Sequence, residues 1–179
     1  MNTFSRSARN EGDTYGAVIT IRQADVRDTE DVSSVLGEAA EWLGKRGIPM
    51  WRGEELSSES ITADVASGEF FIAECDNQVA GTVKFQLCDD LFWPDTSTDE
   101  AAFIHRLAVR RVFAGGFVSG ALLHWASERA RSYNRRFLRL DCDAERLRLR
   151  ATYERFGFRY HSDRQVGPYF VARYQRELH

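Results

Sequence analysis

Residues 104–109 read IHRLAV, and residues 111–123, which follow a single arginine, read RVFAGGFVSGALL. The first run predicts a strand, the glycines predict a turn, and the apolar run after them predicts a helix. A helix N-terminus gathers unpaired backbone N–H groups, and small residues before it let an anionic phosphate come close. This order of elements therefore predicts a binding site for a phosphorylated ligand.

The composition of the 179-residue chain predicts one folded domain, since 43% of the residues are hydrophobic and 28% are charged. The formal net charge of -3 gives no broad attraction to nucleic acid. Cys75, Cys88 and Cys142 form no CxxC pair, so neither disulfides nor a metal site are expected, and reduced thiols in the cytoplasm fit better. No apolar run approaches the ~20 residues of a membrane span, so no membrane partner is expected.

Strand-like and helix-like segments alternate along the chain. We expect residues 1–16 to form a flexible tail and residues 17–179 to form the domain. Strands are expected at residues 17–22, 70–75, 79–87, 102–109, 138–142, 158–160 and 169–174. Helices are expected from Asp28 or Thr29 up to Gly47 and Pro49, from Ser57 or Ser58 to Gly68, after the glycine turn, and over residues 144–156. Residues 76–78 should form a hairpin turn and residues 89–100 a polar loop.

The chain also resembles a known family, and the residues that carry the resemblance are Leu107–Val109, 114–119, 121–123 and Tyr153–Phe158. In this order and spacing they resemble the GNAT superfamily of acyl-CoA-dependent N-acyltransferases, over about residues 17–176. Residues 104–109 and 138–142 are similar to those of a bacterial subgroup of small-molecule acetyltransferases.

The resemblance implies an α+β fold with a mixed, mainly antiparallel sheet of six or seven strands flanked by helices. It also implies that the sheet is split between its fourth and fifth strands, residues 102–109 and 138–142. A helix connects these two segments, so the strands must be parallel if they are neighbours.

The resemblance further implies acetyl-CoA, or another acyl-CoA, as cosubstrate, with no metal. The backbone of Leu107 and Val109 would pair with the pantetheine arm, and the N–H groups of residues 114–119 would hold the pyrophosphate. Arg146 stands where the family usually has Asn and could touch phosphate or adenine. The cosubstrate-binding residues expected in this way are Leu107, Ala108, Val109, Ala114, Gly115, Gly116, Phe117, Val118, Ser119, Gly120 and Arg146.

The glycine turn departs from the family pattern, which has Arg or Gln at position 114 and Gly at positions 117 and 119. This chain has Ala114, Phe117 and Ser119 there. Two functions therefore stay open: an enzyme, or a catalytically weak or inactive acyl-CoA-binding or regulatory module. The enzyme would move an acetyl group to a primary amine of a small molecule or peptide by direct attack in a ternary complex. Nucleic-acid binding through the arginines between Arg129 and Arg150 is weaker, because several of them alternate with apolar residues.

Two residues are candidates for proton transfer. The resemblance aligns Tyr153 with a tyrosine beside the CoA sulfur, where it would act as general acid. An attacking amine must lose a proton, and His105 is the best candidate base, although a lone strand histidine is as often structural.

A substrate pocket is expected near Trp93, Asp99 and Glu100, where an aromatic wall and acidic groups would attract an amine cation. Asp99 and Glu100 are also rival candidates for the base, and the alternative for both is a solvated acidic loop. Trp42 could contribute to the same aromatic wall, although its helical spacing is more typical of a core residue. A small-molecule amine or peptide is the expected partner, without nucleic acid or membrane, and a homodimer stays open.

Overall fold

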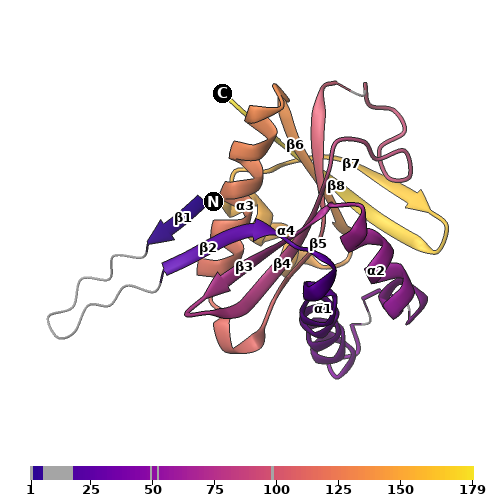
Figure 1. Cartoon of the computed structure of the whole chain (residues 1–179). Helices are drawn as coiled ribbons and strands as arrows, with labels where there is room; N and C mark the ends of the chain where they lie inside the picture. Colours follow the sequence, from indigo (N-terminus) through magenta and orange to yellow (C-terminus); the bar gives the residue numbers. More distant parts are fainter. Residues whose placement is uncertain (1, 6–17, 49, 52, 98) are drawn as a thin grey trace, which may run out of the picture. The chain divides into compact units, whose positions relative to one another are not determined.

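The computed structural model describes residues 2–5, 18–48, 50–51, 53–97 and 99–179, and these ranges contain eight strands and four α-helices (Figure 1). The chain, expected to form one domain, contains two compact units. The first consists of the chain up to Lys84 together with Arg106–Leu122, and the second consists of Phe85–His105 and Leu123–His179. In the ranges given above, no helix combines the length and hydropathy that a membrane span needs.

Antiparallel pairing connects the strands of the first unit in chain order. These strands are β1 (Asn2–Ser5), β2 (Val18–Gln23), β3 (Phe70–Cys75) and β4 (Gln78–Gln86, to Lys84 in this unit). Asp76 and Asn77, with φ angles of 50° and 60°, make the two-residue hairpin turn between β3 and β4. The expected three-residue turn is therefore one residue shorter, because Gln78 already pairs with Cys75.

Strand β1 corrects the expectation of a flexible tail over residues 1–16. Asn2–Ser5 pairs with β2, with Asn2 opposite Ile21. The backbone of this segment is therefore paired with β2 in the sheet, which its polar composition did not predict. The other residues of the expected tail lie outside the described ranges.

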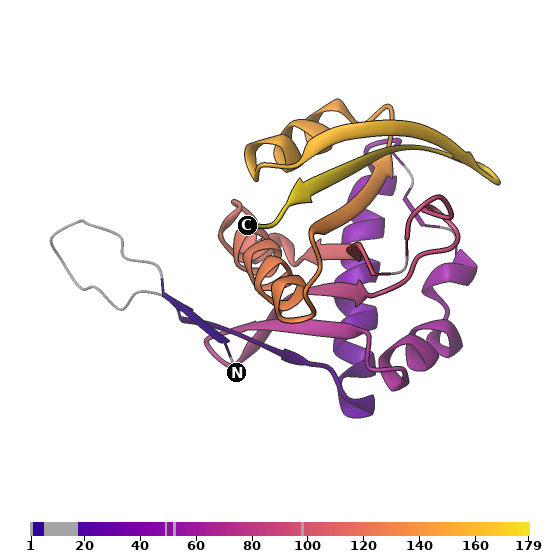
Figure 2. The ribbon, with the colours of Figure 1, turned by 90° about the horizontal axis from the view of Figure 1, so that it is seen from above.

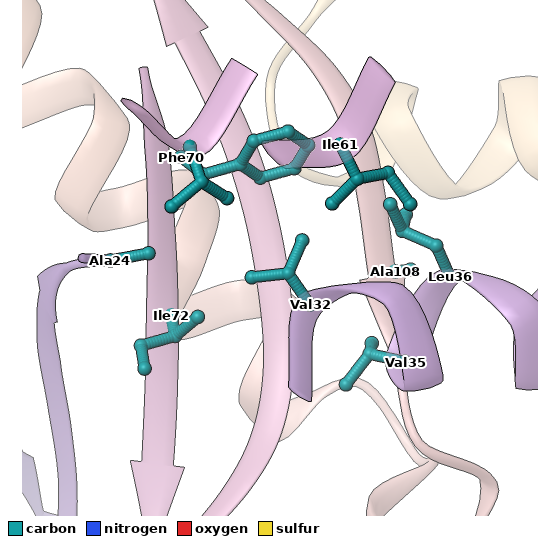
Figure 3. Packing of buried hydrophobic residues seen from close by; sticks show 9 residues of the cluster. Ala24, Val32, Val35, Leu36, Ile61, Phe70, Ile72 and Ala108 are labelled. Atoms are coloured by element: carbon teal, nitrogen blue, oxygen red, sulfur yellow. The ribbon is translucent and has the colours of Figure 1, made fainter. Parts of the chain in front are cut away.

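Two helices of the first unit, α1 (Thr29–Gly44) and α2 (Ser58–Ala66), bury their apolar faces against β3 (Figure 3). The buried positions of α1 recur at helical spacing, whereas β3 is buried on both faces and contributes Phe70 and Ile72 to this cluster. The cluster consists of Ala24, Val32, Val35, Leu36, Ile61, Val65, Phe70, Ile72 and Ala108. Burial of each large aliphatic or aromatic side chain contributes about 1.5–3 kcal/mol, so this cluster fixes both helices on the sheet.

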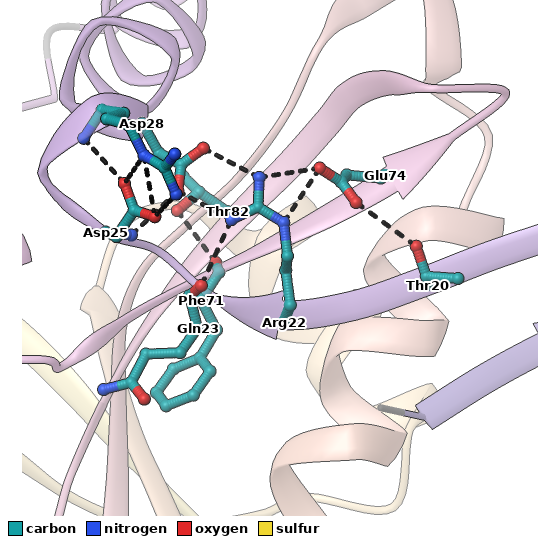
Figure 4. Close-up of polar contacts among 9 residues, drawn as sticks. Thr20, Arg22, Gln23, Asp25, Asp28, Phe71, Glu74 and Thr82 are labelled. Atoms are coloured by element: carbon teal, nitrogen blue, oxygen red, sulfur yellow. Dashed lines mark hydrogen bonds and ion pairs between the residues drawn. The ribbon is translucent and has the colours of Figure 1, made fainter.

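Asp28 lies at the N-cap position of α1, as expected, but its side chain makes no capping hydrogen bond. Asp25 caps the preceding 3-10 turn, η1 (Val26–Asp28), instead. The carboxylate of Asp28 accepts hydrogen bonds from Arg22 at 2.7 and 2.8 Å, and Arg22 also donates to Glu74 (Figure 4). A charged network thus ties the start of α1 to β2 and β3. Ser57 does cap α2, accepting the backbone N–H of Ser60.

The second unit contains the first part of β5 (Ala101–Val109), β6 (Phe137–Asp143), β8 (Tyr169–Glu177) and β7 (Arg159–Val166), and the last three run side by side (Figure 2). Among the described strand pairs of this unit, β5–β6 is parallel and the β6–β8 and β7–β8 pairs are antiparallel. The β5–β6 register runs from Ala101 and Phe137 to Ile104 and Leu140, although both strands continue. The predicted split therefore falls after these residues, and the expected fold class is confirmed, with eight strands because β1 adds one.

Several boundaries in the second unit differ from the expectation, among them those of β7 and α4. β7 continues to Val166 beyond the expected residues 158–160, because antiparallel pairing with β8 satisfies its polar backbone. Helix α4 (Leu147–Arg155) begins three residues later than expected. The carboxylate of Asp143 accepts the N–H of Glu145 and holds the preceding segment in a turn.

Candidate active site

The glycine turn of the first unit connects β5 to α3 (Phe117–Ser132, to Leu122 in this unit). Gly115 and Gly116 have φ angles of 135° and 95°, which residues with a Cβ rarely adopt. The N–H of Gly120 donates to the carbonyl of Gly116 at 2.8 Å and closes the first helical turn. Phe117, where the family pattern has glycine, is the first helical residue and is partly buried. The two glycines before it therefore supply the unusual backbone angles.

Backbone donors gather where α3 begins. Within the described ranges, the N–H groups of Gly115, Gly116, Val118 and Ser119 have no recorded hydrogen-bond acceptor. The positive end of a helix dipole adds to the field of such groups. This turn has the donors that an anionic phosphate requires.

Arg110 and Arg111 precede the turn and attach it to α1. The side chain of Arg110 donates to the carbonyl of Val79 at 2.8 Å and pairs with Glu38 at 3.4 Å. The N–H of Arg111 donates to the same Glu38 carboxylate at 2.7 Å, and its guanidinium lies 4.0 Å from the centre of the Trp42 ring. The two arginines therefore hold the entrance to the turn in place.

The end of β5 is closely packed and locally strained. A Cβ on Gly81 of β4 would lie 2.8 Å from the carbonyl oxygen of Ala108, so the two strands approach closely there. Arg106 has a φ of 49°, a left-handed conformation that is costly for a residue with a Cβ. Asp64 of α2 accepts a hydrogen bond from Arg106 at 3.1 Å and one from Lys84 at 2.9 Å. This ion-pair cluster fixes the side chain of the strained residue Arg106.

Tyr153 lies on α4 in the second unit and is 8% exposed. Its ring contacts Phe158 edge-to-face at 6.0 Å, and no hydrogen bond of its hydroxyl is recorded among the described residues. Burial, together with the nearby Cys142 and Asp141, raises the pKa of the phenol. The hydroxyl therefore keeps its proton at neutral pH and can act only as a donor of that proton.

His105 lies between two carboxylates in the second unit. Its Nε2 is 3.1 Å from Oδ2 of Asp89, and its Nδ1 is 3.3 Å from Oδ1 of Asp141. The Asp89 carboxylate is fixed through its other oxygen, which accepts the N–H groups of Leu91 at 3.2 Å and Phe92 at 2.9 Å. Strand β5 thus contributes His105, strand β6 contributes Asp141, and the loop between β4 and β5 contributes Asp89.

The two carboxylates change the protonation of His105. Burial alone would lower the pKa of the imidazole, but the interactions with Asp141 and Asp89 outweigh it and raise the pKa to about 9. The carboxyl of Asp89 has a lowered pKa: burial raises it, and the contacts with His105 and two backbone N–H groups more than compensate. The resting cluster is therefore an imidazolium beside an ionised carboxylate. A histidine that acts as base must first lose this proton.

Trp93, Asp99 and Glu100, which were expected to line a substrate pocket, are engaged in packing and in ion pairs. Trp93 is 2% exposed and belongs to a hydrophobic cluster, with the Arg139 guanidinium 4.9 Å from its ring, so it is a core residue and not a pocket wall. Asp99 pairs with Arg135 at 2.9 Å, and Glu100 pairs with Arg139 at 3.3 Å. These ion pairs anchor the loop between β4 and β5.

Asp89 and Asp141 were not singled out from the sequence. Asp141 carries a recognisable signal, because it is an ionisable residue in a strand whose neighbours Leu140 and Cys142 are buried. A charge in such a position requires a partner. Asp89 shows no comparable signal, since its position in a polar loop is ordinary for an aspartate.

A model of the Acetyltransferase (GNAT) family matches residues 36–158. The chain belongs to the GNAT acetyltransferase family. It is 31% identical over 139 residues to the uncharacterised N-acetyltransferase YesJ of Bacillus subtilis (strain 168), a match that covers 74% of this chain and 77% of YesJ. Membership assigns the chain to a family of acyl-CoA-dependent acetyltransferases.

Solved GNAT structures share the fold. A GNAT family acetyltransferase from Listeria monocytogenes superimposes with a TM-score of 0.76 at 24% identity, covering 94% of this chain and 100% of the other. The PaiA N-acetyltransferase of Thermoplasma acidophilum, solved in complex with coenzyme A, gives a TM-score of 0.69 at 17% identity and covers 89% and 98%.

Proposed function

We propose that this GNAT protein transfers an acetyl group from acetyl-CoA to a primary amine of a small molecule or peptide. The observation that carries the proposal is the turn at Gly115 and Gly116, whose backbone N–H groups find no acceptor among the residues that the structure describes. A diphosphate is the group that such donors suit. The complex of the PaiA N-acetyltransferase with coenzyme A, a protein of similar fold, supports the same cosubstrate.

The proposed cosubstrate site is completed by the end of β5 and by Arg146. The backbone of Leu107 and Val109 would pair with the amides of the pantetheine arm, as an added strand pairs with a sheet edge. Arg146, the N-cap residue of α4, would contact phosphate or adenine in this proposal. Ala114 contributes only backbone there, so the arginine contact of the family pattern is absent.

The properties of the cysteine thiols favour direct attack by the amine over a covalent enzyme intermediate. Burial raises the pKa of Cys142 to about 12 and also raises that of Cys75, so neither forms the thiolate that a covalent intermediate needs. In the proposed step the amine nitrogen forms a bond to the thioester carbonyl carbon and the carbon–sulfur bond breaks. Tyr153 gives a proton to the departing sulfur, and the proton released from the amine replaces it.

The competing function is an acyl-CoA-binding or regulatory module without turnover, which Ala114 and Phe117 favour. Calorimetry with acetyl-CoA on wild type and Phe117→Gly separates the two. We expect wild type to bind with micromolar affinity and Gly116→Ala to weaken binding about tenfold, because a Cβ strains a φ of 95°. Gly37→Ala, on an exposed position of α1, is the matched control.

Three outcomes decide between these functions. Wild-type binding, followed by amine-dependent release of free thiol, supports the acetyltransferase. Binding by Phe117→Gly alone supports the module. If neither protein binds acetyl-CoA, the cosubstrate assignment is wrong.

A further inference from the structure

Three groups that can each accept a hydrogen bond converge in the second unit. One atom each of Asp89, His105 and Asp141 lies within 4.8 Å of the other two. The side chains of Asp89, Asp141 and His105 are 5%, 11% and 16% exposed, so the cluster is largely withdrawn from water. Asp141 directly follows the last β6 residue that pairs with β5.

Two oxygens of the cluster are incompletely used. Oδ2 of Asp89 and Oδ1 of Asp141 are buried and have no well-aligned hydrogen-bond donor within the described part of the chain, although both lie near the imidazole. Oδ1 of Asp89 is occupied by two backbone N–H groups, which aim Oδ2 into the cluster. A buried carboxylate oxygen without an aligned donor is costly, so this arrangement favours a further donor.

A primary ammonium group matches these positions. It carries three N–H donors in tetrahedral directions. With N···O distances of about 2.8 Å, two of its acceptors lie about 4.6 Å apart. Two carboxylate oxygens provide two acceptors within this span, and the imidazole nitrogen provides the third once His105 has lost its proton.

We propose that Asp89, His105 and Asp141 form the site for the acceptor amine, in which the carboxylates bind the ammonium and His105 is the catalytic base. This inference rests on the proposed function. His105 precedes Leu107, the proposed pantetheine partner, by two residues in the sequence. The sequence-based role of His105 is thereby retained, with a requirement for two aspartates that the sequence did not indicate.

The charge of the cluster explains how His105 becomes a base. In the free protein the imidazolium compensates the carboxylates. An arriving ammonium replaces that positive charge, and like-charge repulsion releases the imidazolium proton to solvent. The neutral imidazole then takes one proton from the ammonium, which leaves an amine whose lone pair attacks the thioester carbon. The second amine proton leaves after the carbon–nitrogen bond has formed and balances the proton given to sulfur.

A metal ion is the competing occupant. One ligand atom of each residue lies within 4.8 Å of the other two, so the same three groups could hold a metal ion, and the experiment below includes that outcome. One oxygen of Asp89 is committed to backbone donors, which removes bidentate coordination by that carboxylate.

The test follows the His105 ring resonances by NMR in the histidine-labelled full chain. The probes are butylammonium, 1,4-diaminobutane and Nα-acetyl-lysine methylamide, with tetramethylammonium as a cation that has no N–H donor. We expect saturable shifts of His105 with at least one primary ammonium and none with tetramethylammonium. Asp141→Asn and Asp89→Asn should each weaken the response about tenfold or more, because a charge-assisted hydrogen bond is lost. Asp90→Asn, on an exposed neighbour, should leave it unchanged.

Several results overturn the proposal. They are no response to any of the three amines, an equal response to tetramethylammonium, or a His105 response to Mg²⁺ or Zn²⁺ without one to amines, which would identify a metal site. Acetyl-CoA calorimetry on the same samples separates the two proposals. Retained acetyl-CoA binding without an amine response contradicts the amine site alone, whereas lost acetyl-CoA binding contradicts the proposed function.

Activity provides a second measurement. Asp141→Asn should raise the KM for the amine about tenfold while the KM for acetyl-CoA stays unchanged. A merely structural role would change both constants or the unfolding midpoint. A fall in kcat with both KM values unchanged would therefore contradict amine binding by Asp141.

Discussion

Replacement of His105 by glutamine should remove a strong pH dependence of folding stability. In the folded protein the imidazole faces the carboxylates of Asp89 and Asp141, and the ring of Phe92 is the other neighbour, with centroids 5.9 Å apart. The pKa of His105 is raised from 6.5 to about 9, so the folded chain binds this proton more tightly than the unfolded chain. Proton binding therefore stabilises the fold.

The size of the effect follows from the two pKa values. Each tenfold increase in proton affinity corresponds to about 1.4 kcal/mol, so a rise from 6.5 to about 9 contributes about 3 kcal/mol. The contribution is complete below the unfolded pKa of 6.5 and is lost as the pH rises through about 9. In His105→Gln it is absent at every pH.

Urea unfolding of wild type and His105→Gln at about pH 6, 7.5 and 9.5 measures the effect. The stability difference between the two proteins should be largest at the lowest pH and shrink by about 3 kcal/mol toward the highest. His124→Gln, at an exposed position of α3, is the control for the replacement of a histidine by glutamine. A pH-independent difference between wild type and His105→Gln would refute the ion-paired imidazolium.

Three further predictions concern packing, the loop and the thiols. Gly81→Ala should lower the free energy of unfolding by about 1–3 kcal/mol, because its Cβ meets a backbone oxygen at 2.8 Å, whereas Gly37→Ala in an open helical position should raise it by up to about 1 kcal/mol; equal effects in thermal unfolding would contradict this packing. Asp95→Asn should lower the free energy of unfolding in urea by about 1–2 kcal/mol, because it removes the 2.6 Å ion pair between half-exposed Asp95 and the buried Arg173 guanidinium. An unchanged unfolding midpoint would mean that the pair contributes nothing. Cys88 is the exposed thiol among the three cysteines, and a hydrogen bond to a neighbouring aspartate raises its pKa. One thiol should therefore react with a disulfide reagent in the native protein, and the reaction should become faster as the pH rises. Cys88→Ser should abolish this reaction, and a reaction that persists in the variant would contradict the assignment.

Local sequence patterns were sufficient for most of the fold. The helical spacing of Val32, Val35 and Leu36 and the cap at Ser57 predicted α1 and α2, because periodicity and capping act over a few residues. Strand β1 and the extension of β7 could not be predicted in this way. Both depend on pairing with residues distant in the chain, and the hydrogen bonds of a strand are satisfied only by its partner.

The chemistry of the candidate site divides along the same line. The sequence by itself determined the strand, glycine turn and helix around Gly115 and Gly116, because φ angles near 100° restrict the residue type locally. It also indicated His105, but as an isolated residue. Only the tertiary structure brought Asp89 and Asp141 to the two sides of that ring, 16 and 36 residues away in the chain. Protonation depends on distance in space and on burial, and neither is written in the order of the residues.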